Sequence, residues 1–271
     1  MYHSDRHFSV ALKVIFAGFL VFFSQLKADT GTLTETIIEY LQSPMGQSLI
    51  LDSLDISPDR RDIYAQHIHD LYSDEVLLRD MVENLLSATD DLTVGDPDQV
   101  AMIIAEVGFG VVQQAISSGL NRLHPDDTRI LITHDVRLIE NLPPDLCVAV
   151  LDGNLTAEER RSLGAWYQGQ LSREELRQYL LLSRKAITSY FHGSPAPKTI
   201  SPAQEQIALD TLTRRVSQHP HAELLEPILT SPSSFSEAEI CWANIEVIWL
   251  AIHEPGVVGD WLIIWAANDL H

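Results

Sequence analysis

The sequence predicts an all-α protein, in which residues 29–271 form a single globular domain of roughly ten to twelve helices. Signals that start helices recur along the chain, and stretches with the helical spacing of apolar side chains follow them. Apolar residues make up 45% and charged residues 21% of the chain, shares that are typical of a folded protein rather than a disordered one. With 271 residues, the chain is long enough to bury its own hydrophobic core.

Residues 1–28 have the pattern of a secretory signal peptide. Two basic side chains precede an apolar run over residues 14–23, and a short polar stretch then ends at Ala28. This order predicts cleavage after Ala28 and export, either into a bacterial periplasm or out of the cell, with no transmembrane segment in the mature chain. The alternative is an uncleaved inner-membrane anchor formed by residues 8–26, although its apolar run is shorter than the roughly 20 residues that span a bilayer.

Helix starts can be assigned in chain order. Ser57 and Ser73 each precede acidic residues and are expected to begin helices. A helix over residues 98–120 is apolar nearly all round, which is typical of a central helix packed by neighbours on most sides. Later helices begin with capping boxes, in which Ser or Thr is followed three residues later by Glu or Gln: Thr156–Glu159, Ser172–Glu175, Ser201–Gln204 and Ser234–Glu237.

Three segments have a less certain structure. Residues 192–201 contain Gly, Pro and Ser and form the best linker candidate, which could separate a small C-terminal lobe. Because only about 70 residues follow it, we favour a surface loop within one domain. The short apolar runs over residues 130–133 and 147–151 fit either a strand or a helix.

The chain has two cysteines, Cys147 and Cys241, and both lie in the part that would be exported. In an oxidising compartment they could form a disulfide that closes a loop of about 95 residues. Apolar neighbours on both sides fit two buried thiols equally well. The chain has no Cys-x-x-Cys motif, so we expect no structural zinc, and we expect no cofactor.

Eleven histidines suggest a search for acid–base and metal sites. His67 and Asp70 share one helix face, and His134 with Asp135 could join them only through tertiary packing. Glu106 lies in the apolar helix over residues 98–120, where burial would raise its pKa, but it also continues a polar stripe that would face water. These are weak catalytic candidates, because the common hydrolase and metalloprotease motifs are absent from the sequence.

A second group of histidines lies at a predicted helix junction. Flexible geometry there could bring His219, His221 and the carboxylate of Glu223 together. A surface loop with ordinary polar residues explains the same pattern, so we assign no metal to it.

Four of the five tryptophans lie near the C-terminus: Trp242, Trp249, Trp261 and Trp265. Their spacing of seven and four residues puts each pair on one helical face. The pattern favours a hydrophobic core built by two C-terminal helices. The alternatives are a partner-docking surface with aromatic anchors and association with a membrane.

The charge balance is the main indication of function. The chain has 18 Lys and Arg against 38 Asp and Glu and a net charge of −20; cleavage after Ala28 would leave −22. Such a surface repels phosphate, so we expect no nucleic-acid partner. The sequence favours an exported acidic protein that masks or escorts a cationic protein partner, such as a toxin or a cell-wall hydrolase. The alternatives are an envelope hydrolase that uses scattered His and Asp residues, and a structural envelope protein.

Overall fold

The computed structural model describes residues 30–54, 56–89 and 110–269. Within these ranges the chain is all-α and contains no strand, which confirms the predicted fold class. The chain divides into two compact units, Met1–Ala115 with Ser172–His192, and Ile116–Leu171 with Gly193–His271. The predicted signal peptide lies outside the described residues, as does the part of the helix over residues 98–120 that precedes residue 110.

The first unit contains the N-terminal helices and one helix from the middle of the chain. Its elements are α2 (Thr30–Gln42), α3 (Pro44–Ser53), the 3-10 turn η1 (Pro58–Arg60), α4 (Arg61–Tyr72), α5 (Glu75–Thr89) and α10 (Arg173–Phe191). Ile37 and Ile38 of α2 are buried against Leu78 and Val82 of α5. This contact forms one apolar centre of the unit.

Ion pairs join α10 to α4. Arg173 donates to Asp62 at 2.6 Å near the first turn of both α10 and α4, and Arg184 pairs with Asp70 further along. Since the two pairs follow the same chain order, α10 and α4 run in the same direction. An exposed pair such as Arg173–Asp62 contributes about 0–1 kcal/mol, so it selects the register more than it stabilises the fold.

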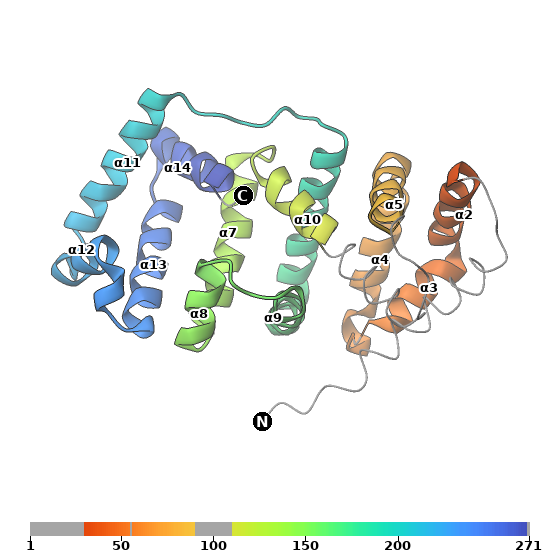
Figure 1. Cartoon of the computed structure of the whole chain (residues 1–271), viewed down its shortest axis with the longest axis horizontal. Helices are drawn as coiled ribbons and strands as arrows, with labels where there is room; N and C mark the ends of the chain where they lie inside the picture. Colours follow the sequence, from red (N-terminus) through yellow and green to blue (C-terminus); the bar gives the residue numbers. More distant parts are fainter. Residues whose placement is uncertain (1–29, 55, 90–109, 270–271) are drawn as a thin grey trace. The chain divides into compact units, whose positions relative to one another are not determined.

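The second unit is built around α13. Its elements are α7 (Pro125–Glu140), α8 (Pro144–Leu151), α9 (Ala157–Gln170), α11 (Pro202–Ser217), α12 (Ala222–Thr230), the 3-10 turn η2 (Pro232–Ser234), α13 (Glu237–Ile252) and α14 (Gly256–Asp269). Helix α13 contacts α7, α8, α11, α12 and α14 (Figure 1). Its mostly apolar sequence allows this, because a helix packed on several sides can leave few positions for charged side chains.

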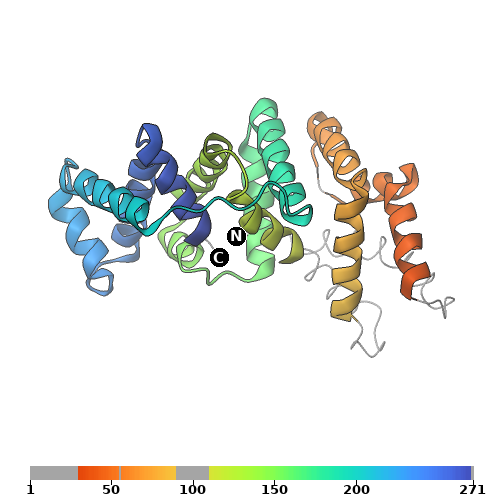
Figure 2. The same ribbon diagram turned by 90° about the horizontal axis from the view of Figure 1, so that it is seen from above.

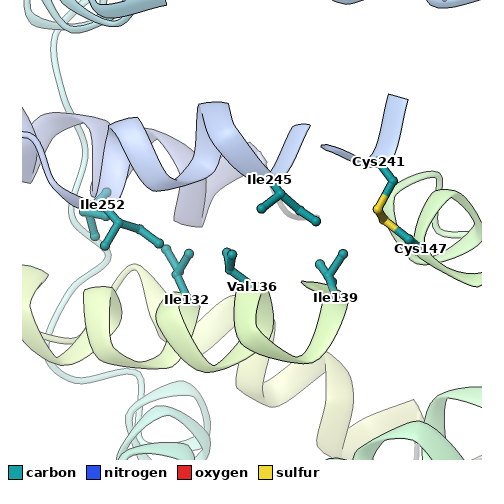
Figure 3. Packing of buried hydrophobic residues seen from close by; sticks show 8 residues of the cluster. Ile132, Val136, Ile139, Cys147, Cys241, Ile245 and Ile252 are labelled. Carbon is teal, nitrogen blue, oxygen red and sulfur yellow. A yellow bond between two sulfur atoms is a disulfide. The ribbon is translucent and has the colours of Figure 1, made fainter. Parts of the chain in front are cut away.

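The main core of the second unit lies between α7 and α13. Ile132, Val136 and Ile139 follow one face of α7 and point toward the isoleucines of α13 (Figure 3). The Cys147–Cys241 disulfide lies at one end of this core and joins α8 to α13, with 5.9 Å between the two Cα atoms. Of the two alternatives for the cysteines, the structure therefore contains the disulfide.

Local capping chemistry explains most helix starts, with corrections at Ser57, Ser73 and Ser234; Ser73 ends α4, and Asp74 caps α5 instead. The predicted boxes at Thr156, Ser172 and Ser201 all form. The prediction of a box at Ser234 is wrong, because residues 232–234 form a 3-10 turn and Ser236 with Glu239 caps α13 instead. Ser57 precedes the 3-10 turn η1 without a side-chain cap. The two ambiguous apolar runs belong to helices α7 and α8.

Lys198 fastens the segment between α10 and α11 to the rest of the second unit. Residues 193–201 contain no helix. The Lys198 backbone N–H donates to the carbonyl of Asn121 at 2.8 Å, and its Nζ donates to the carbonyl of Arg122 at 2.9 Å and to the next carbonyl. Arg122 in turn donates to the carbonyl of Pro195 at 2.8 Å. These bonds hold an irregular segment in place without regular secondary structure.

Candidate functional site

The predicted pair His67 and Asp70 lies in the first unit, on α4. The Asp70 carboxylate accepts hydrogen bonds from Arg184 and, at 2.6 Å, from Gln66. Burial, together with the smaller effect of the positive charge of Arg184, lowers the pKa of His67 to about 4. A half-buried imidazole with so low a pKa is a poor general base near neutral pH, because its lone pair has little affinity for a proton.

His134 and Asp135 lie in the second unit, on different sides of α7. His134 is 3% exposed, and its Nδ1 lies 2.8 Å from the hydroxyl of Tyr167, which is also buried. This bond explains how a polar ring is accommodated in the core. Desolvation by nearby protein raises the pKa of Asp135 to about 7, but the residue is exposed. Contact with water favours the charged carboxylate, so Asp135 is assigned no proton transfer.

The five weak catalytic candidates are distributed over different parts of the chain. Two belong to the first unit, two belong to the second, and Glu106 lies outside the described residues. Among the residues that the structure describes, no group of three or more His, Cys, Asp or Glu side chains is placed to hold a metal ion. Asp70 and His134 each have a local structural role, through Arg184 and through the Tyr167 hydroxyl.

The C-terminal tryptophans lie at the edge of the core. All four are partly buried. The Trp249 indole donates to Glu140, and its ring stacks on His253 with centroids 5.1 Å apart. Trp242 packs against a second apolar cluster, formed by buried residues of α11, α12 and α13. These contacts give Trp242 and Trp249 a packing role in the second unit.

The second histidine group is assembled with a different carboxylate from the one considered in the sequence. His219 Nε2 lies 3.4 Å from a carboxylate oxygen of Glu246 on α13, and the ring of His221 packs edge-on against Trp242. The His221 backbone N–H donates to His219 Nδ1 at 3.2 Å. Because Nδ1 accepts this bond, the neutral ring carries its proton on Nε2, toward Glu246. This tautomer leaves no lone pair on Nε2 for a metal, so the group is a structural contact.

Many of the basic side chains in the described residues lie in ion pairs, whereas the acidic side chains outnumber them. Eight arginines of the described chain lie within ion-pair distance of Asp or Glu: Arg60, Arg61, Arg79, Arg129, Arg173, Arg177, Arg184 and Arg215. Each of these arginines thus lies beside a carboxylate of the same chain. The excess carboxylates remain, and they set the sign of the surface potential.

The C-terminal acidic segment, residues 216–271, shows this imbalance most clearly. It contains no Lys or Arg and eight Asp or Glu. Two of these carboxylates pair with arginines outside the segment, Glu254 with Arg215 at 2.7 Å and Asp260 with Arg129 at 3.1 Å. The absence of basic residues could have been read from the sequence, although the tryptophans are the more conspicuous feature of this region.

Comparison with known proteins adds no functional assignment: no protein-family model, curated protein or solved structure matches the chain. Within the described ranges, none of the helices combines the length and the apolar character needed to cross a lipid bilayer.

Proposed function

We propose that this chain is an exported acidic protein that binds and masks a cationic protein partner. The observation that carries the proposal is the unbalanced negative charge. The net charge is −20, many arginines are held in internal ion pairs, and the last 56 residues have no basic side chain. The excess of negative charge would speed the encounter with a basic partner and disfavour acidic competitors.

Two features support the exported location. A buried disulfide joins α8 to α13, and such bonds persist in oxidising compartments such as the periplasm and the extracellular space. The pattern of residues 1–28 predicts a signal peptide with cleavage after Ala28. We propose a toxin or a cell-wall hydrolase as the class of the cationic partner.

Acidity could instead serve only solubility, and an affinity capture separates the two explanations. The tagged full-length chain is exposed to an extract of its native cells at about 0.1 M salt and eluted at about 1 M, because this change shortens the Debye length from about 10 to about 3 Å. We expect one basic protein in stoichiometric amount in the eluate, identified by mass spectrometry. If the eluate contains no such chain, the binding proposal is wrong and solubility is the simpler explanation.

A further inference from the structure

Helix α12 has one buried side and one exposed side that both carry apolar residues. Leu225 and Ile228 are 0% and 2% exposed and belong to the second apolar cluster of the unit. Leu224 and Leu229 are 54% and 37% exposed. Helix α12 lies at the edge of its own unit in two views, where it contacts α11, α13 and η2 (Figures 1 and 2). Exposed leucines at such an edge are available to a partner.

Two carboxylates lie between these exposed leucines. Successive residues of a helix are turned by about 100°, which places Glu223 and Glu226 about 60° apart around the helix axis. Leu229 lies about 60° beyond Glu226 on one side. Leu224 lies about 100° beyond Glu223 on the other side. Both glutamates are exposed, and one carboxylate oxygen of Glu226 accepts a hydrogen bond from the Ser217 hydroxyl at 2.7 Å. The exposed side of α12 is therefore an acidic strip with a leucine at each border, which we name the α12 strip: Glu223, Leu224, Glu226 and Leu229.

Pro227 adds to the same surface. It is exposed and lies inside α12, between Glu223 and Leu224 on the helical wheel. Because proline has no N–H, it cannot donate to the carbonyl of residue 223, four residues earlier. The pyrrolidine ring extends the apolar border next to Leu224.

We infer that the α12 strip is the docking surface for the cationic partner, and that the partner contributes a basic segment that also carries apolar side chains. This inference rests on the proposed function and adds the place and the chemistry of recognition. The leucines require an apolar contact, and the carboxylates of a segment without any Lys or Arg require positive charge. A second copy of this chain, or an anionic lipid surface, carries the same negative sign and would be repelled.

Two synthetic probes separate the apolar contribution from the charge. One is an amphipathic peptide of lysine and leucine, and the other is an oligolysine with the same number of lysines. We expect the full-length protein to bind the lysine–leucine peptide more tightly. The variant L224S/L229S should bind the lysine–leucine peptide about tenfold more weakly and bind oligolysine as tightly as the wild type. Complete burial of a leucine side chain contributes about 1.5–3 kcal/mol, and these two leucines are already partly buried, so only part of this free energy is lost. Ile207→Ser removes a similarly exposed apolar side chain, 48% exposed on α11, and should have little effect.

A pair of charge reversals locates the site. E223K/E226K should weaken both probes by at least about tenfold, whereas E39K/E83K, which makes the same change in net charge in the first unit, should weaken them less than about threefold. Equal weakening by both pairs would overturn docking at α12 and leave the proposed function intact. Unchanged peptide binding by L224S/L229S would overturn the apolar contact. If neither probe binds wild-type protein at about 0.1 M salt, the proposed function itself fails. Tryptophan fluorescence of each variant checks that the second unit is folded.

Discussion

Removal of the Cys147–Cys241 disulfide should destabilise the second unit by about 4.7 kcal/mol. The bond joins residues 94 apart, and the chain-entropy model assigns this free energy to a loop of that length. With a urea slope of about 2 kcal/mol per M, the unfolding midpoint should fall by about 2 M. Both cysteines are buried in the core between α7, α8 and α13, so packing lost in C147A/C241A adds to the effect.

Tryptophan fluorescence is the appropriate assay, because all five tryptophans of the chain belong to the second unit. The signal therefore follows the unit that contains the disulfide. Urea unfolding is measured for the wild type with and without a reductant and for C147A/C241A, on which the reductant should have no effect. Equal midpoints for the oxidised wild type and for C147A/C241A would refute the reasoning, since the disulfide would then restrict nothing in the unfolded chain.

Three further changes test individual contacts. A Cβ at Gly259 would lie 1.8 Å from a backbone carbonyl oxygen, so Gly259→Ala should lower the free energy of unfolding by at least about 2 kcal/mol. Gly164 lies within α9 with open space where a Cβ would be added, so the control Gly164→Ala should raise the free energy of unfolding by about 1 kcal/mol. The pKa of His67 is lowered to about 4 in the folded state, so the unfolded chain binds more protons between about pH 6.5 and 4. The free energy of unfolding should therefore be highest above about pH 6.5 and fall by about 1–3 kcal/mol as the pH drops to about 4. His67→Gln should flatten this loss and the exposed His69→Gln should not, as circular dichroism of urea unfolding at about pH 7 and 4.5 would show. Lys198→Met should cost about 1–2 kcal/mol in the tryptophan assay through two lost bonds to carbonyls; a cost near zero would contradict its role in holding the loop.

Features that depend on a few neighbouring residues could be predicted from the sequence. A capping box needs only a hydroxyl and an acid or amide three residues later, and this was sufficient at Thr156, Ser172 and Ser201. The failure at Ser234 has the same local character. Ser236 and Glu239 have the same pattern two residues later, and the 3-10 turn that begins at Pro232 includes Ser234. Local rules identified the helix but could not choose between two overlapping signals.

Pairings between distant residues could not be predicted. The contact of His219 with Glu246 depends on how the α11–α12 junction packs on α13, and sequence spacing instead suggested Glu223. Similarly, α10 belongs to the unit of α2–α5 although α9 precedes it directly in the chain. Its ion pairs with α4 bridge residues more than 100 positions apart, Arg173 to Asp62 and Arg184 to Asp70. Such partners are selected by the packing of whole helices.

The central claim, that negative charge recruits a cationic protein, is tested most directly by the association rate constant of the purified full-length chain with the basic protein recovered by affinity capture. The rate is measured by stopped flow at about 0.1 M and about 1 M salt, which shortens the Debye length from about 10 to about 3 Å. We predict a fall of at least about tenfold at the higher salt concentration, because screening removes the electrostatic steering. A rate constant that is equal at both salt concentrations would contradict the claim.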